Sequence, residues 1–175
     1  AEKSQGSLVS PTDGLLTLPQ MFTAQAFIIT DLDDNQITAF HPGAMNHSHE
    51  NHVGDAAGVT LGIVAPDGRD GMLQHAREFH AAGIPFIFDP GQGLTLFSGP
   101  ELAALIEQAR YVAVNDYEAK LLSERTGWSI ADIAGRVDAL VVTLGAEGSV
   151  IHANGATYAI SAVRPKSIVD PTGCG

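Results

Sequence analysis

The sequence predicts an α/β fold built on an open, mostly parallel β-sheet with helices on both faces. Two observations lead to this prediction. Short apolar runs bounded by glycine, proline or aspartate recur along the chain, as is typical of buried parallel strands. Segments with apolar residues at helical spacing lie between them. Strand and helix therefore alternate, which is the pattern of a parallel sheet covered by helices.

The N-terminal part of the chain predicts a loop followed by a hairpin. Residues 1–21 contain Pro11, Gly14 and Pro19 without a sustained period, so they are interpreted as a loop-rich segment and left unassigned. The runs 24–30 and 36–40 are rich in β-prone residues and flank the turn-forming Asp33-Asp34-Asn35. This pattern favours an antiparallel β-hairpin.

The rest of the chain divides into strands and helices in turn. Buried strands are predicted over 59–64, 84–88, 111–114 and 139–143, and helices over 70–82, 99–109 and 116–125. Met72, Ala76 and Phe79 illustrate the helical spacing, and Asp116 is the expected N-cap of the third helix. A second hairpin is predicted over 149–160 around Asn154-Gly155, a residue pair that favours tight hairpin turns.

Composition excludes several classes of function. The formal net charge is −11, and the nine lysine and arginine residues are scattered, which argues against binding to nucleic acid. No run of eighteen apolar residues is present, so no membrane partner is expected. The single cysteine, Cys174, permits no internal disulfide and suits a reducing compartment. An acidic, soluble, cytoplasmic enzyme is the interpretation that fits these features.

The end of the sequence carries its most informative motif. Asp170 and Thr172 precede Gly173-Cys174-Gly175. A Gly-x-Gly turn at the start of a helix leaves successive backbone N–H groups open to an anion, and the helix dipole favours negative charge there. The alternative is an ordinary glycine-rich turn. For Asp170, a turn-forming or capping role before a proline explains the residue type equally well.

Two further motifs follow predicted strands. Asn115 and Glu118 lie one helical turn apart, so both can approach one phosphate chain, and the carboxylate of Glu118 suits Mg²⁺ held through water. The alternative is that they only cap a helix and offset its dipole. Thr143, Gly145 and Gly148 follow the next strand, where glycines allow a nucleotide close to the backbone or simply form a tight connection. Ligands of open α/β sheets bind at such strand ends.

These motifs, in this order, resemble those of the PfkB carbohydrate kinase family, which includes ribokinase and adenosine kinase. Residues 170–175 resemble the signature Asp-Thr-x-Gly-Ala-Gly-Asp without its final Asp, with Pro171 and Cys174 in place of the commoner Thr and Ala. Residues 115–118 resemble the family's Asn-x-x-Glu element. Residues 141–148 are similar to its nucleotide-binding strand and turn.

The resemblance implies a ribokinase-like fold and transfer of the γ-phosphoryl group of ATP to a hydroxyl group. It implies an anion hole at Gly173, Cys174 and Gly175, with the general base Asp absent from the sequence. It also implies the following ligands: ATP at Asn115, Thr143, Gly145 and Gly148, Mg²⁺ through water at Glu118, and K⁺ as a candidate at Asp170 and Thr172. Because family members are considerably longer, the chain is interpreted as an internal fragment that is inactive alone.

The resemblance also implies a division of the chain into two parts and a class of substrate. It implies that residues 22–45 are part of a β lid over the substrate and that 46–175 form an incomplete α/β core. Residues 42–46 follow the hairpin and are expected near the substrate. Adenosine or a related nucleoside is the first expectation for the acceptor, and a ribokinase- or fructokinase-type sugar kinase is the alternative. A non-catalytic nucleotide-binding domain and a homodimer are also left open.

A histidine-rich stretch allows one more interpretation. His41, His47, His49 and His52 are spaced closely enough to ligate zinc. No cysteine joins them and the stretch is polar, so a solvated loop is the alternative.

Overall fold

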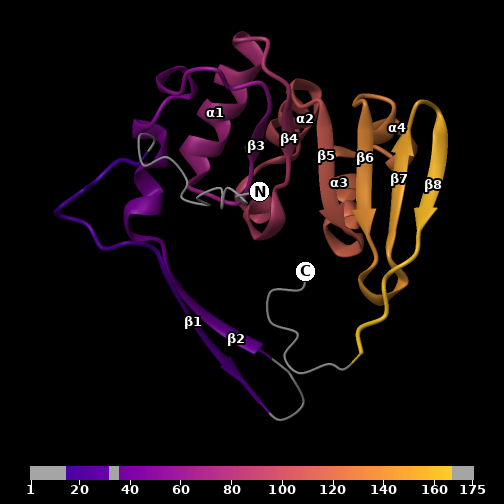
Figure 1. Cartoon of the computed structure of the whole chain (residues 1–175), viewed down its shortest axis with the longest axis horizontal. Helices are drawn as coiled ribbons and strands as arrows, with labels where there is room; N and C mark the ends of the chain where they lie inside the picture. Colours follow the sequence, from indigo (N-terminus) through magenta and orange to yellow (C-terminus); the bar gives the residue numbers. More distant parts are fainter. Residues whose placement is uncertain (1–14, 32–35, 167–175) are drawn as a thin grey trace, which may run out of the picture.

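The larger of two sheets forms the body of the molecule. The computed structural model describes residues 15–31 and 36–166, and its main sheet has six strands in the order β3-β4-β5-β6-β7-β8 (Figure 1). They are β3 (Gly62–Val64), β4 (Phe86–Phe88), β5 (Tyr111–Asn115), β6 (Ala139–Thr143), β7 (Ser149–Ala153) and β8 (Ala156–Ile160). Strands β3 to β6 pair in parallel, whereas β7 and β8 are antiparallel additions at one edge. The predicted mostly parallel α/β sheet is confirmed.

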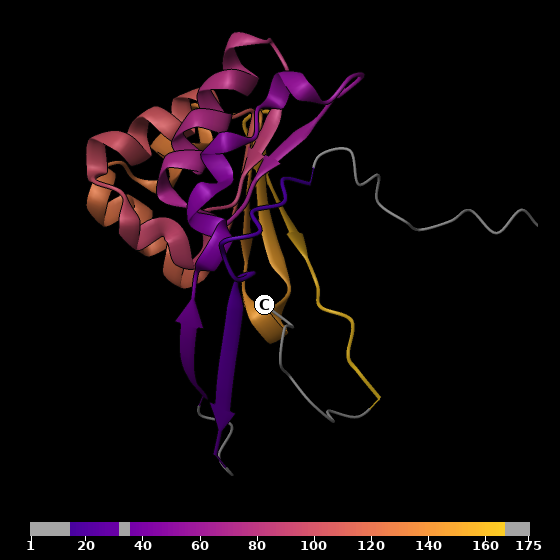
Figure 2. The same ribbon diagram turned by 90° about the vertical axis from the view of Figure 1, so that its left-hand side faces the viewer.

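Helices connect the parallel strands. The α-helices of the described residues are α1 (Arg69–Ala81), α2 (Gly99–Gln108), α3 (Asp116–Thr126) and α4 (Ile130–Ala134). Short 3₁₀ segments are η2 (Gly43–Glu50), η3 (Val53–Asp55), η4 (Gly91–Leu96) and η5 (Gly145–Glu147). Figure 2 shows all four α-helices on the same face of the sheet. None of the helices in the described part of the chain has the length and apolar character that crossing a membrane requires.

The core lies between this helical layer and the sheet. Alternate strand residues point into it, and Phe86, Phe88 and Val112 have no exposed surface. Each fully buried side chain of this kind contributes roughly 1.5–3 kcal/mol through the hydrophobic effect. Residues that alternate with them face the other side of the sheet, where Ile63 is 57% exposed. The described helices therefore cover one face, whereas helices on both faces were predicted. The packed core lies on the covered face.

A two-stranded sheet stands apart from this body. It pairs β1 (Gln25–Thr30) with β2 (Gln36–His41) in antiparallel register, from Gln25 opposite His41 to Thr30 opposite Gln36. The first predicted hairpin is confirmed, while its expected turn at 33–35 lies outside the described residues. At its base, the N–H of Ala44 donates to the carbonyl oxygen of Phe22 at 2.8 Å. This bond ties the two ends of the hairpin together.

Several boundaries differ from the predicted ones for identifiable reasons. β3 begins at Gly62 rather than at residue 59, because only three of its residues pair with β4. The second hairpin is confirmed, and its turn residues Asn154 (φ 53°) and Gly155 (φ 72°) have the left-handed conformation of a type I′ turn. Helix α4 is not predicted by apolar spacing, because it is only five residues long. The Ser129 and Asp132 capping box at its start is the sequence signal that identifies it.

The N-cap predicted for α3 is wrong by one residue. Asn115, not Asp116, occupies the position: its backbone is extended and its side-chain oxygen accepts a hydrogen bond from the N–H of Glu118. Asp116 is the first helical residue, where its negative charge still interacts favourably with the helix dipole.

Close packing of α2 against the end of α3 depends on Gly99. A Cβ atom at this position would overlap the backbone oxygen of Arg125, which cannot move without shifting the helix end. We therefore expect Gly99→Ala to lower the free energy of unfolding by about 1–3 kcal/mol in urea titrations. Gly135→Ala is the matched control, because Gly135 has φ −73° and its added Cβ would make an ordinary 3.4 Å contact. Its effect should be within about 0.5 kcal/mol, and equal losses in both variants would contradict the packing argument.

Candidate functional site

A cavity of about 930 Å³ lies where the base of the hairpin meets the carboxyl ends of the parallel strands. Five segments line it: the hairpin base, η2, the β3–α1 junction, η4 and the β5–α3 junction. The lining residues are Ala24, Phe40, Pro42, Met45, Asn46, Pro66, Asp67, Gly68, Arg69, Gly91, Gln92, Gly93, Leu96, Asn115 and Glu118. The position follows the general rule for ligand sites in open α/β sheets.

Asn115 and Glu118 enter this cavity as a reciprocal capping box. The N–H of Glu118 donates to Asn115 Oδ1 at 2.8 Å, and the N–H of Asn115 donates to Glu118 Oε2 at 2.9 Å. This arrangement holds both side chains at the N-terminus of α3, which carries a partial positive charge. Within the described part of the chain, Asn115 Nδ2 and Glu118 Oε1 have no hydrogen-bond partner. Capping therefore uses one polar atom of each side chain and leaves the other for a ligand.

Arg69 supplies the positive charge among the described lining residues, and its neighbours hold it in place. Its guanidinium forms an ion pair with Glu101 and a 3.3 Å contact with Asp70, and Nε donates to the carbonyl oxygen of Leu96 at 3.3 Å. It also lies 6.0 Å from the ring centre of Phe97. Arg69 thus joins the start of α1 to η4 and α2, and its charge is largely compensated by carboxylates.

The turn after β4 forms another wall of the cavity. Asp89 ends the strand, and its carboxylate accepts a hydrogen bond from the N–H of Gly91; burial raises the pKa of Asp89 and this bond partly offsets the effect. Gly91 has φ 45°, and a Cβ there would collide with the Pro66 ring. The turn therefore packs tightly on the end of β3. Asp89 itself is not among the residues that line the cavity.

The predicted nucleotide residues after β6 lie beside the cavity rather than in its wall. Thr143 is the register partner of Asn115 on the neighbouring strand, so the two strand ends meet at one edge of the sheet. Gly145 (φ 55°) begins η5, and Gly148 (φ 100°) comes so close to Ile160 that a Cβ would overlap its backbone oxygen. Part of the glycine pattern is thus explained by strand packing alone. A nucleotide role for these residues stays a prediction.

The predicted anion-hole and cation residues lie outside the described residues. They are Asp170, Thr172, Gly173, Cys174 and Gly175. Their roles stay predictions.

The histidine-rich stretch forms contacts of another kind. Among the described residues, no group of three or more His, Cys, Asp or Glu side chains is placed to hold a metal ion, so the zinc interpretation has no support. His47 pairs with Glu50 at 2.7 Å, and His52 pairs with Glu78 at 2.7 Å. The first pair lies within η2, whereas the second connects the segment after η2 to helix α1.

Sequence reasoning missed the part of the cavity formed by Asp67, Gly68 and Arg69. These residues join β3 directly to α1, so they lie at the same carboxyl edge as Asn115. The signal available in the sequence was this short strand-to-helix connection. Gln92, in the turn after β4, also lines the cavity and was not predicted.

Comparison with known proteins identifies the family of this chain. Residues 11–175 match the pfkB family carbohydrate kinase. A nucleoside kinase of Methanocaldococcus jannaschii is 34% identical over 153 residues, which cover 87% of this chain and 50% of that protein. The chain spans about half the length of the curated relatives it matches.

Solved structures agree with this match. The Burkholderia thailandensis nucleoside kinase in complex with inosine is 58% identical, with a TM-score of 0.87 over 90% of this chain and 53% of that one. The same kinase in complex with ADP-inosine gives a TM-score of 0.85 at 58% identity, covering 90% of this chain and 49% of that one. From the matched motifs, the shared fold and these similarities, the chain belongs to the PfkB family of carbohydrate kinases.

Proposed function

We propose that this chain is part of an ATP-dependent kinase that phosphorylates a hydroxyl group of a nucleoside. One observation carries the proposal: the capping box of Asn115 and Glu118 opens into the same cavity as Phe40 at the hairpin base. A helix terminus that favours anions and the hairpin, which we assign as part of the lid, thus line one cavity. Relatives named nucleoside kinases, at 34% and 58% identity, support the same acceptor class.

The charge of the cavity supports a bound cation. Its described lining contains two carboxylates, Asp67 and Glu118, and one guanidinium, Arg69, whose charge is compensated by Glu101. A polyphosphate would be repelled by this lining unless a cation accompanied it. The unpartnered Glu118 Oε1 fits Mg²⁺ held through water, since Mg²⁺ keeps much of its hydration shell. When bound, Mg²⁺ would neutralise charge on the phosphate oxygens.

Other roles follow from the motifs. We propose that Asn115, Thr143, Gly145 and Gly148 contact ATP. We also propose that the backbone amides of Gly173, Cys174 and Gly175 form the anion hole. Asp170 and Thr172 are proposed as K⁺ ligands. Phosphoryl transfer needs mainly positioning and charge stabilisation, which backbone amides can supply. A cytoplasmic location suits the acidic chain and its single cysteine.

The acceptor is proposed to bind under the hairpin. Residues 22–45 are assigned as part of the lid and 46–175 as part of the α/β core, with Pro42, Met45 and Asn46 at the junction of the two on the cavity wall. Asn46 and Gln92 offer amide groups that have no hydrogen-bond partner elsewhere in the described residues. An amide both donates and accepts, so it suits the polar edge of a nucleobase or a sugar hydroxyl. Inosine is the nucleoside that the Burkholderia structure contains.

The first prediction concerns the acceptor. In an ADP-release assay on the product of the complete open reading frame that encodes this chain, we expect turnover with inosine or adenosine in the presence of ATP and Mg²⁺. Ribose and fructose should react at least about tenfold more slowly, because they lack the base that the cavity would contact. The assay is repeated with and without K⁺, and stimulation by K⁺ would support Asp170 and Thr172.

Other outcomes of this assay decide between alternatives. Faster turnover of ribose or fructose would replace the proposal with a sugar kinase. ATP binding without ADP release, for every acceptor, would indicate a non-catalytic nucleotide-binding domain.

The second prediction concerns Glu118. Glu118→Gln keeps an oxygen that accepts from the N–H of Asn115 but removes the charge, so the helix cap should survive. We expect the phosphorylation rate to fall by about 10–100-fold, and the Mg²⁺ concentration for half-maximal rate to rise. Asp116→Asn is the matched control: it removes the same charge two helical positions earlier, from a residue outside the wall of this cavity. Equal Mg²⁺ dependence in the two variants would contradict a role for Glu118 as a metal ligand.

A further inference from the structure

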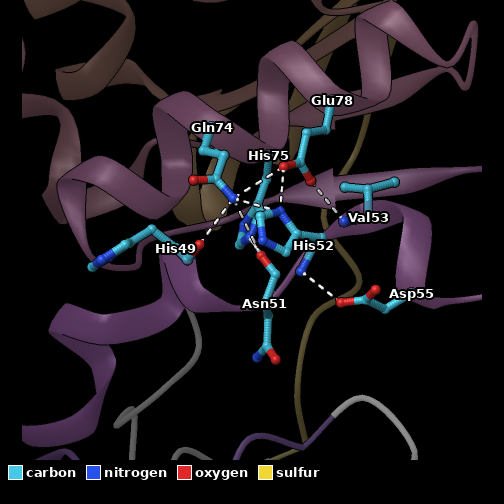
Figure 3. A network of polar contacts seen from close by, with 8 residues as sticks. All are labelled: His49, Asn51, His52, Val53, Asp55, Gln74, His75 and Glu78. Atoms are coloured by element: carbon cyan, nitrogen blue, oxygen red, sulfur yellow. Dashed lines mark hydrogen bonds and ion pairs between the residues drawn. The ribbon is translucent and has the colours of Figure 1, made fainter.

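A polar network outside the cavity fastens the segment 43–55 to helix α1 (Figure 3). His52 Nδ1–H donates to Glu78 Oε1 at 2.7 Å, and the N–H of Val53 donates to Glu78 Oε2 at 2.7 Å. Gln74 Nε2 donates to the carbonyl oxygen of His49 at 2.9 Å. His75 Nε2 lies 3.0 Å from the carbonyl oxygen of Asn51. Gln74, His75 and Glu78 lie within about one turn of α1 and thus hold four residues between His49 and Val53.

Close backbone packing strengthens this attachment at the other end of the segment. A Cβ at Gly71 would overlap Ser48 Oγ, and a Cβ at Gly68 would lie 2.6 Å from the carbonyl oxygen of Met45. The first turn of α1 is therefore free of side chains where η2 crosses it. The position of η2 is set by α1 through these glycines and through the network at Glu78.

The same η2 segment forms the floor of the cavity and the base of the hairpin. Met45 and Asn46 line the cavity. Ala44 bonds to Phe22 at the start of the hairpin, and β2 leads into η2 through Pro42. Any displacement of η2 relative to α1 would therefore move both the cavity floor and the hairpin base.

We propose that Glu78 and His52 are positioning residues for nucleoside binding, acting as an anchor that holds η2 and the hairpin base against α1. This inference rests on the proposed nucleoside site, because it assigns the anchor its effect through Met45 and Asn46. Neither Glu78 nor His52 lines the cavity, so the effect is indirect.

The anchor is also sensitive to pH. The hydrogen bond from His52 to Glu78 raises the pKa of His52 most. Burial is the next effect in size and lowers this pKa, while the charges of Glu78 and Asp55 raise it further, so the pKa of His52 is raised overall. Burial raises the pKa of Glu78, but the bonds from His52, Val53 and Gln74 outweigh it, so the pKa of Glu78 is lowered overall. The network contains two other histidines: His75 on α1, whose ring contacts the carbonyl oxygen of Asn51, and His49 on η2, which takes part through its backbone carbonyl oxygen (Figure 3).

The direction of the pH effect follows from these shifts. A histidine with a raised folded-state pKa contributes its full stabilisation below its ordinary value of 6.5 and loses it as the pH rises through the raised value. A carboxylate with a lowered pKa loses its contribution only under acidic conditions. The charged pair is therefore complete at mildly acidic pH and weakens as the solution becomes alkaline.

The experiment measures inosine binding by calorimetry at about pH 6 and about pH 8, on the product of the complete open reading frame. We expect the dissociation constant of the unaltered protein to rise about threefold between these pH values, a size typical of one exposed ion pair. Glu78→Gln should bind weakly at both pH values. His52→Arg keeps a positive charge throughout, so it should bind tightly at both.

His47→Asn is the matched control. It removes a histidine–glutamate pair of the same 2.7 Å length, but both partners lie in η2, so the pair attaches nothing to α1. This variant should show the pH dependence of the unaltered protein. If His47→Asn and Glu78→Gln change binding equally, or if His52→Arg retains the full pH dependence, the anchor is refuted.

A second measurement separates this proposal from the proposed function. Without nucleoside, the amide of Val53 should exchange its hydrogen faster in Glu78→Gln than in His47→Asn, because loss of the charge weakens its bond to residue 78. Faster exchange without any inosine binding by the unaltered protein would refute the proposed nucleoside site and leave only a structural clamp. Unchanged exchange in Glu78→Gln would refute the anchor, whatever the protein binds.

Discussion

Parallel pairing of β3, β4, β5 and β6 is the constraint on which the rest of the structure depends. Parallel strands bring all their carboxyl ends to one edge, and each must be followed by a connection that returns to the opposite edge. Residues 66–69, 89–93 and 115–118 are therefore brought together although they are far apart in sequence. The register that sets Asn115 beside Thr143 extends this edge toward the glycines after β6. The position of the site is therefore set by the strand topology, and the side chains at the strand ends determine only its chemistry.

The capping box at Asn115 shows how a structural and a functional role coexist in the same residues. Asn115 and Glu118 each use one polar atom to complete the helix end. Both residues line the cavity, at a helix terminus that already favours negative ligands, and their remaining polar atoms have no hydrogen-bond partner among the described residues. The sequence allowed helix capping alone to explain these residue types, and both residues do cap the helix. What the fold adds is the position of both residues on the wall of a cavity.

Local patterns in the sequence were enough for most of the elements. Alternating β-prone residues identified both hairpins, and the Asn154-Gly155 pair identified its own turn. Family motifs identified Asn115 and Glu118, whose place on the cavity wall depends only on the strand before them. In contrast, η2 and η4 have no apolar period, because short 3₁₀ segments are held by contacts with other elements rather than by one buried face.

The anchor could not be predicted, because Glu78 and His52 lie 26 positions apart. Only the packing of η2 across Gly68 and Gly71 brings them together. Long-range polar pairs of this kind leave no periodic trace in the sequence. The histidine-rich stretch was visible, but its partners on α1 were not.

The hairpin has two faces with different surroundings. Phe40 faces the cavity, and the register places Ala26 and Ile28 on its side. Phe27, Ile29 and Ile37 lie on the opposite side and are 61%, 72% and 74% exposed. Because side chains alternate strictly along a strand, inserting or deleting a single residue between Phe22 and β1 would turn the side chains of β1 to the opposite face unless its pairing with β2 shifted. The hairpin should therefore accept many substitutions in evolution, whereas a change of one residue in the length of its base would turn the wrong side toward the cavity.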